Sequence, residues 1–273
     1  MAISFDRSRG SALPSATASP APLLLTGGSG RLGRALQTLV FAGGPGDARL
    51  VAPSRALLDV TCPDSVRRAL DRHRPALVIH AAAVVGWREA ERDRARTWAV
   101  NVTGTGVVVA ACRESGVGLL HVSSPAVFDG VQGLYREEDP PCPAYYYGET
   151  KRAAEELALS LPDALVVRLD FFDPAEPFKH AALLGDHFCS KLPVAEAARR
   201  VLLAVQLGAR GLLHVGGPRV ALARLLRPYW PDLPETTIAR SPLPDFPRDL
   251  SLSTARFDRL VGATASPAPE VLP

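Results

Sequence analysis

A tyrosine and a lysine lie one helical turn apart in the segment Tyr147-Gly148-Glu149-Thr150-Lys151, and an apolar run upstream ends in Ser123-Ser124. Residues four apart on a helix share a face. A lysine ammonium beside a phenol favours the phenolate and lowers a pKa that is ordinarily about 10. With Ser124 holding a substrate oxygen, Tyr147 could exchange a proton with a ketone or alcohol near neutral pH. Surface helices also contain this spacing by chance. The spacing therefore indicates a catalytic pair only together with the elements that surround it.

A glycine-rich segment follows the first apolar run, residues 22–26, and precedes a helical stretch at 34–41. Strand, glycine loop and helix in this order are the context of a dinucleotide-binding site. In such a loop Gly27, Gly30 and Gly33 permit a tight turn, the approach of backbone to a pyrophosphate, and close packing of helix on strand. The helix N-terminus would offer free N–H groups to phosphate. A glycine turn without a ligand is the alternative interpretation.

The end of the second expected strand favours NADP(H), and NAD(H) stays open. NAD sites usually place an acid there to bind the ribose hydroxyls, whereas this chain has Pro53-Ser54-Arg55. Arg55 could pair with a 2′-phosphate and Ser54 could add a hydrogen bond. A solvated surface arginine is the alternative. Asp59 and Val60 could reach the adenine edge, or they could form the turn into the next helix.

Strands and helices alternate along the first part of the chain. This alternation predicts an α/β fold, a Rossmann-like doubly wound parallel sheet with right-handed crossovers and helices on both faces. The glycine loop and Ser124 both follow strand ends, so they should face one crevice beyond the carboxyl ends of the strands. We expect strands at 22–26, 49–53, 76–80, 118–122, 164–168 and 212–215, and helices at 34–41, 63–73, 91–114, 147–161 and 194–207.

The same pattern divides the chain into three regions. Residues 1–20 are rich in Ser, Ala and Pro and lack the apolar core of a secretory signal, so we expect a disordered arm. Residues 21–170 should form the dinucleotide-binding Rossmann domain. In residues 171–273 the alternation loosens into a Pro-rich, irregular tail. This part should form a small C-terminal substrate-binding lobe, partly interleaved with the Rossmann domain.

Composition argues against several other classes of function. The net charge of +3 over 273 residues, with arginines and acids interspersed, does not indicate a nucleic-acid partner. No apolar stretch of the sequence reaches the length that a membrane span needs. Cys62, Cys112, Cys142 and Cys189 lie far apart. We therefore expect isolated thiols in a reducing, cytoplasmic setting, and no metal site.

The motifs together resemble a known family. The chain is similar to extended short-chain dehydrogenases/reductases and, among them, to the dTDP-4-dehydrorhamnose reductase (RmlD-like) branch. The resemblance spans roughly residues 23–260. The matching stretches are 26–33 (TGGSGRLG), 58–61 (LDVT), 80–83 (HAAA), 101–105 (NVTGT), 127–130 (VFDG), 135–141 (YREEDPP), 147–151 (YGETK) and 247–252 (PRDLSL).

The resemblance implies an NADP(H)-dependent oxidoreductase acting on a small-molecule carbonyl or alcohol, and it is compatible with a homodimer. Tyr147 would be the proton donor, Lys151 its partner and a ribose ligand, and Ser124 the family's catalytic Ser or Thr. The residues expected to contact the cofactor are Gly27, Gly30, Arg31, Leu32, Gly33, Ser54, Arg55, Asp59, Val60, Ala81, Ala82, Ala83, Asn101, Tyr147 and Lys151.

Departures from the branch pattern leave the substrate open. Pro125-Ala126 follows Ser124 where the branch carries Asp-Tyr and the related dehydratases carry Asp-Glu, which argues against a dehydratase. In the expected substrate site, which includes Ser124, the residues Val85, Trp87 and Phe171 would form an apolar wall. Arg248 could bind an anionic group of the substrate, or it could pair with a local Asp.

We therefore expect an NADP-dependent reductase of a ketone, keto-sugar or natural-product intermediate, with hydride from NADPH and a proton from Tyr147. Two alternatives stay open. An NAD(P)-dependent sugar-nucleotide epimerase would use the same residues with a tightly held cofactor. A non-catalytic NADP-binding regulatory subunit would not need Ser124, Tyr147 and Lys151 together.

Overall fold

Six parallel strands form the central sheet of the protein, here a computed structural model that describes residues 21–42, 49–178, 181–240 and 246–264. The expected arm at residues 1–20 lies outside the described residues. The order reverses between β1 and β3, and in such sheets ligands bind beyond the strand ends at this point. Across the sheet the strands are β10 (Gly211–Val215), β5 (Leu165–Leu169), β4 (Gly118–Ser123), β3 (Leu77–His80), β1 (Leu23–Thr26) and β2 (Leu50–Val51).

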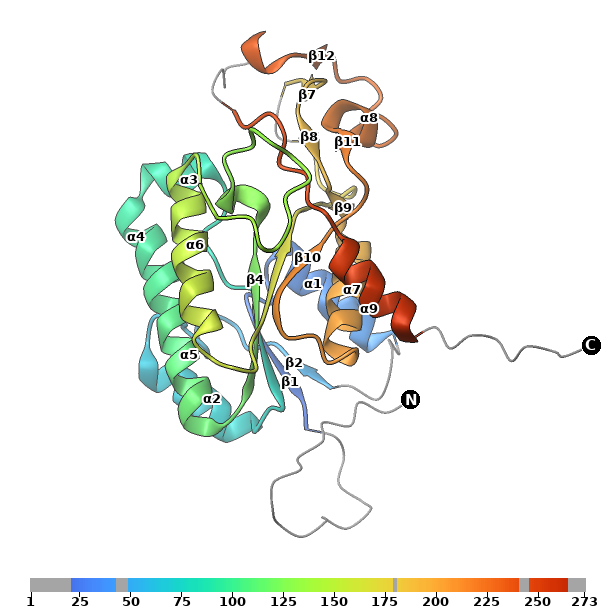
Figure 1. Ribbon diagram of the computed structural model, residues 1–273. Coiled ribbons are helices and arrows are strands. Elements are labelled where there is room, and N and C mark those ends of the chain that lie inside the picture. The colour runs from blue at the N-terminus through green and yellow to red at the C-terminus, as the bar shows by residue number, and fades with distance from the viewer. Residues whose placement is uncertain (1–20, 43–48, 179–180, 241–245, 265–273) are drawn as a thin grey trace, which may run out of the picture.

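Helices cover both faces of this sheet, as Figure 1 shows. Because successive strand residues point to opposite faces, Leu23 and Leu25 enter one apolar core and Leu24 enters the other. This arrangement confirms the expected α/β, doubly wound class. One face carries α1 (Arg31–Phe41), α7 (Val194–Gln206) and α9 (Ala255–Thr264); the other carries α2 (Pro63–His73), α3 (Trp87–Arg92), α4 (Arg94–Trp98), the π-helical segment η1 (Ala99–Thr103), α5 (Gly104–Ser115) and α6 (Tyr146–Leu159).

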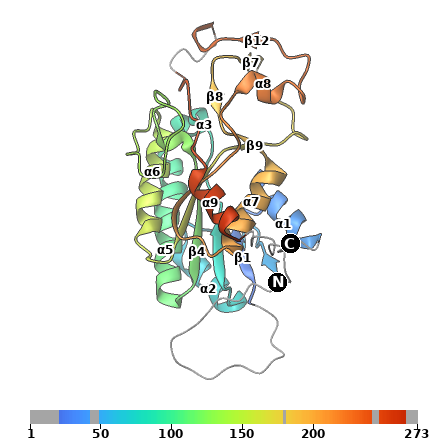
Figure 2. The same cartoon turned by 45° about the vertical axis from the view of Figure 1, so that its right-hand side comes forward.

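A smaller lobe stands above the carboxyl ends of the strands (Figure 2). It is built from short paired strands, and the chain returns from it to the central sheet through α7 and β10. The strand pairs are β6 (Phe171–Phe172) with β9 (Leu192–Pro193), β7 (Leu183–Leu184) with β12 (Glu235–Thr236), and β8 (Phe188–Cys189) with β11 (Val220–Ala221); α8 (Leu222–Leu226) and the 3-10 turns η2 (Pro125–Val127) and η3 (Ile238–Arg240) complete the elements.

Three elements differ from the sequence-based expectation. Helix α1 begins at Arg31 instead of 34, because extended Gly30 is its N-cap. The helix expected at 91–114 is interrupted at Asp93, whose carboxylate accepts the N–H of Arg96 and caps α4. Asp favours such caps because its short side chain reaches the free N–H groups. The tail expected to be irregular contains α9, where the Thr254 hydroxyl binds the Asp258 carboxylate.

A buried ion pair joins β5 to α6 behind the strand ends. Arg168 and Glu155 approach to 2.8 Å and are almost completely buried. The Ser123 hydroxyl donates to Glu155, and the guanidinium lies 4.8 Å from the Phe128 ring centroid and 3.3 Å from His214 Nε2. The network fixes the helix that carries Tyr147-Gly148-Glu149-Thr150-Lys151 against β4 and β5.

None of the described helices is both long and apolar enough to span a bilayer.

Candidate active site

The three expected catalytic side chains converge at the carboxyl end of β4. Ser124 directly follows β4, and Tyr147 and Lys151 come from the first turns of α6. The Ser124 hydroxyl is near enough to the phenol of Tyr147 to lower the pKa of that phenol. The Ser124 oxygen also accepts the N–H of Ala126 at 3.2 Å, which holds the serine at the start of a 3-10 turn. Ser124 and Tyr147 thus bring two hydroxyls to the same end of β4, as binding a single carbonyl oxygen requires.

The acidity of Tyr147 differs from the expectation that a neighbouring lysine lowers it. Burial, then the Asp170 carboxylate, raise the pKa of Tyr147 to about 12, and the Ser124 hydrogen bond only partly opposes them. The correction has a simple physical cause: removing a phenolate from water costs more than one hydroxyl contact returns. Tyr147 therefore keeps its proton at neutral pH.

Lys151 is buried and directed back at β4, the strand that precedes Ser124. Its Nζ donates to the Val122 carbonyl at 2.7 Å and lies 3.3 Å from His121 Nε2. Burial lowers the pKa of Lys151 to about 8, so it is still mainly protonated at pH 7. An ammonium only donates, so His121 Nε2 accepts and Nδ1 carries the hydrogen. That Nδ1 is the one buried side-chain polar atom without a partner in the described part of the chain.

A second histidine fixes the neighbouring strand ends. The Thr105 hydroxyl donates to the Asn101 carbonyl at 2.6 Å, so it must accept from His80 Nε2, 3.1 Å away. His80 Nδ1 then accepts from the Thr26 hydroxyl at 2.7 Å, whose oxygen receives the Ala82 N–H. Burial, with the charge of Lys151 adding to it, lowers the pKa of His80 to about 3. The neutral ring is a structural tie between β1, β3 and α5.

The glycine loop has the close packing that a dinucleotide cradle needs. Gly27 has φ of +73°, and a Cβ there would lie 2.7 Å from the Ala81 backbone. A Cβ on Gly33 would lie 2.3 Å from the Gly27 oxygen, and the Gly30 N–H donates to that same oxygen at 3.0 Å. Larger residues at Gly27 or Gly33 would therefore collide with the backbone of the loop or of Ala81, which follows β3. The glycines thus let the loop pack directly against β3 and α1.

The remaining expected cofactor residues surround this loop. Asn101 is buried in η1; its Oδ1 accepts the Val84 N–H at 2.8 Å, and its Nδ2 donates to the Val84 carbonyl at 3.0 Å. Ser54 and Arg55 are exposed beyond β2. The Asp59 carboxylate accepts two bonds from Thr61, so it forms a turn. Leu32 and Val60 are buried, Ala81, Ala82 and Ala83 are half-buried, and Arg31 pairs with Glu176 at 3.0 Å.

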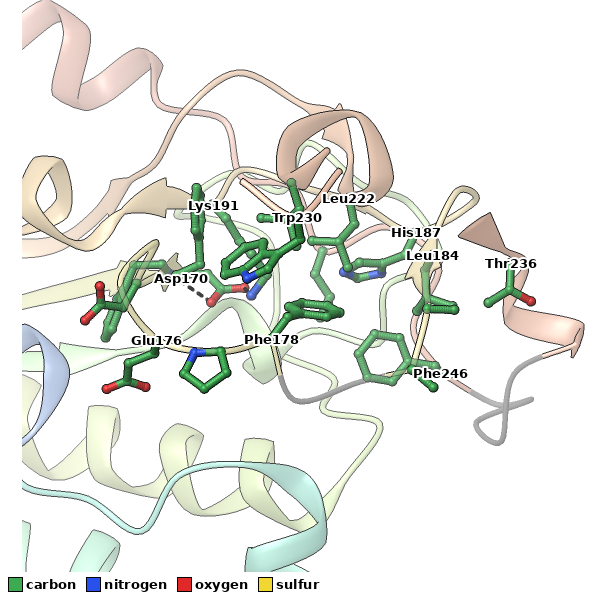
Figure 3. A pocket seen from close by; sticks show the side chains of 18 of the residues that line it. Asp170, Glu176, Phe178, Leu184, His187, Lys191, Leu222, Trp230, Thr236 and Phe246 are labelled. Atoms are coloured by element: carbon green, nitrogen blue, oxygen red, sulfur yellow. Dashed lines mark hydrogen bonds and ion pairs between the residues drawn. The ribbon is translucent and has the colours of Figure 1, made fainter. Parts of the chain in front are cut away.

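A cavity of about 680 Å³ lies between the sheet and the lobe. Trp87 and Phe171, two of the expected substrate residues, line it; Val85, Ser124 and Arg248 are not among its lining residues. Most of its wall is aromatic or aliphatic, and Figure 3 shows Phe178, Trp230 and Phe246 facing it. The stacked rings of Trp87 and Tyr145, with centroids 5.7 Å apart, extend this wall.

The polar residues of this cavity that the sequence analysis did not include in the site are, among others, Asp170, Lys191 and His187. Asp170 comes directly after β5, so the rule that ligands meet the carboxyl ends of strands could have found it. Lys191 and His187 lie in a lobe without periodic pattern, and no local signal marks them. His187 Nδ1 lies 2.8 Å from the Pro247 carbonyl.

No group of three His, Cys, Asp or Glu residues within the described ranges could hold a metal.

Comparisons place the chain among reductases of similar sequence and fold. A family model described as "RmlD substrate binding domain" matches residues 21–172. A dTDP-4-dehydrorhamnose reductase of Streptomyces griseus is 39% identical over 185 residues, which cover 67% of this chain and 57% of that protein. The chain spans about half the length of the curated relatives it matches.

Solved structures extend the likeness into the lobe. A Bacillus anthracis dTDP-4-dehydrorhamnose reductase in complex with NADP has a TM-score of 0.78 at 21% identity, over 90% of this chain and 94% of that one. A hypothetical dTDP-4-dehydrorhamnose reductase of Sulfolobus tokodaii has a TM-score of 0.74 at 27% identity, over 87% and 94%. The expected family resemblance and the Rossmann-like fold are thereby confirmed.

Proposed function

The chain belongs to the RmlD substrate binding domain family, and we propose that it is an NADPH-dependent reductase of a sugar-nucleotide ketone. The observation that carries this proposal is the convergence of Ser124, Tyr147 and Lys151 at the carboxyl end of β4, where Lys151 Nζ donates to the Val122 carbonyl. A module that only binds a nucleotide needs the glycine loop but does not need Ser124, Tyr147 and Lys151 together.

Each residue of the site has a task in this reaction. NADPH, when bound, would supply the hydride that the carbonyl carbon receives. The glycine loop and the α1 N-terminus would bind its pyrophosphate, and Arg55 would bind a 2′-phosphate. Ser124 would donate to the carbonyl oxygen. Tyr147, protonated at neutral pH, would deliver its proton to that oxygen as negative charge develops.

Lys151 would support the tyrosine after the proton has left. Two of its three N–H groups are directed at Val122 O and His121 Nε2, so one donor remains for a ribose hydroxyl. Its positive charge would stabilise the phenolate that the reaction leaves on Tyr147. The sugar-nucleotide class is inferred from the relatives, since the Streptomyces griseus protein is named for dTDP-4-dehydrorhamnose.

The test is the oxidation of NADPH in the presence of dTDP-4-keto-6-deoxyhexoses, with NADH for comparison. We expect turnover with NADPH, and Tyr147→Phe should reduce kcat by about 100-fold or more while the Kd of NADPH changes less than about threefold. Tyr146→Phe is the matched control. Tyr146 is the neighbour of Tyr147 in the sequence, and its hydroxyl donates to the Arg94 carbonyl. Tyr147→Phe with most of its activity intact would contradict the mechanism, and NADPH binding without turnover of any keto-sugar would contradict the function.

A further inference from the structure

A histidine interrupts the apolar run of β4. His121 lies between Leu120 and Val122 and is only 1% exposed. Its Nδ1 is buried and has no hydrogen-bond partner within the described residues, and an unpaired buried N–H costs stability. An apolar side chain would fill this position in the strand without that cost. A contact elsewhere on the ring must therefore account for a histidine here.

That contact joins the other ring nitrogen to Lys151. His121 Nε2 lies 3.3 Å from Lys151 Nζ, and Lys151 is itself buried at 3% exposure. Burial, and after it the charge of Lys151, lower the pKa of His121 well below its ordinary value of 6.5. The ring is therefore neutral at pH 7, so Nε2 can accept an N–H of the ammonium. The contact connects β4 with α6.

Further groups that face the Lys151 ammonium come from β4, α6 and β3. The Val122 carbonyl accepts from it at 2.7 Å. Glu155, one turn further along α6, acts on it through its charge, but the Glu155 carboxylate is bound by Arg168 at 2.8 Å. His80 on β3 is neutral, because burial, and then the charge of Lys151, lower its pKa to about 3. The side chain that accepts directly from the ammonium is thus His121.

We propose that His121 is the positioning residue of Lys151: its neutral Nε2 and the Val122 carbonyl together hold the ammonium in its charged form beside β4. An ammonium has three N–H donors in a tetrahedral arrangement. Two of them are directed at β4, which fixes the direction of the third. The task of that third donor toward the ribose rests on the proposed function, whereas the hold of His121 on Lys151 does not depend on it.

The experiment measures the pKa of Lys151 by NMR titration of isotope-labelled lysine side chains in the full chain without cofactor. The lysines of the sequence are Lys151, Lys179 and Lys191, so Lys151→Met assigns the signal. The pKa in the wild type should be about 8. His121→Leu should lower this pKa by about one unit, because a hydrogen bond to a charged group is lost. His121→Gln should restore the wild-type value, since its amide oxygen accepts a hydrogen bond.

His80→Leu is the matched control. This histidine is as buried as His121, but its ring nitrogens contact Thr26 and Thr105, so its loss should leave the pKa of Lys151 unchanged. Under the proposed function, the alkaline limb of the pH profile of kcat should move to lower pH in His121→Leu and return in His121→Gln. A Lys151 pKa that His121→Leu leaves at about 8, or that His80→Leu lowers equally, would overturn the inference. The expected NMR shifts without turnover of any ketone would support the inference and contradict the proposed function.

Discussion

The ammonium of Lys151 lies 2.7 Å from the carbonyl oxygen of Val122, two residues before Ser124. This bond fixes α6 to the end of β4, and the Ser123 hydroxyl, which donates to Glu155, adds a second tie between the same elements. Lys151 thus has a structural contact besides the role proposed for it toward the ribose and the phenolate. Because burial of the ammonium costs more than this contact returns, substitutions at Lys151 should change stability and activity in different directions.

Lys151→Met should stabilise the fold at pH 7 while activity is lost. Burial lowers the pKa of Lys151 from 10.5 to about 8, which corresponds to a cost of about 3 kcal/mol for the buried ammonium at pH 7. The lost bond to Val122 returns about 1 kcal/mol of that. We expect a net gain of about 2 kcal/mol in the free energy of unfolding, measured by urea denaturation.

The sign of the pH dependence follows from the lowered pKa. Below pH 8 both the folded and unfolded chains are protonated at Lys151, and the whole penalty is present. Between pH 8 and 10.5 only the folded chain has lost the proton, so the wild type regains stability. The advantage of Lys151→Met should shrink over this interval; a variant less stable than the wild type at pH 7 would contradict the burial argument.

Glu155→Gln should destabilise the protein by about 3 kcal/mol, because Arg168 would remain as a buried charge without its carboxylate. Urea denaturation at pH 7 measures the change. Glu156→Gln is the control one residue along the same helix: its carboxylate is exposed and lies 3.5 Å from Arg152, so it should cost less than about 0.5 kcal/mol. Similar costs for both variants would mean that Arg168 is solvated after all.

Gly33→Ala should abolish tight NADPH binding, because its Cβ would lie 2.3 Å from the Gly27 carbonyl oxygen and push the loop away from α1. Calorimetric titration with NADPH should show a Kd at least about tenfold higher. Gly106→Ala provides the comparison within a helix, since the nearest atom to its Cβ would be 3.7 Å away. It should bind NADPH normally and gain about 0.5–1 kcal/mol of stability.

Arg55→Ser should weaken the use of NADPH about 10- to 100-fold and leave the use of NADH nearly unchanged, because the exposed guanidinium is expected to bind only the 2′-phosphate. The ratio of kcat/KM for the two cofactors measures the effect within one variant. A wild-type enzyme that uses both cofactors equally would remove the basis for assigning Arg55 to the phosphate.

Local sequence patterns predicted which elements carry the residues of the candidate site. A strand, Gly27, Gly30 and Gly33, and a helix follow one another directly along the chain, so their geometry depends on near neighbours. Ser124 at a strand end, and Tyr147 and Lys151 one helical turn apart, are likewise local relationships. The fold class followed from the same alternation of strands and helices.

The acidity of Tyr147 and the cavity beyond it depend on distant residues. The phenol pKa is raised by burial and by Asp170, which lies more than twenty positions along the chain, and no helix periodicity contains that information. Lys191 reaches Asp170 only because β9 pairs with β6. The sequence by itself determined the fold class, the glycine loop and the three converging side chains. Only the tertiary structure decided their protonation and the polar pair in the cavity, because desolvation and ion pairing arise from segments that folding brings together.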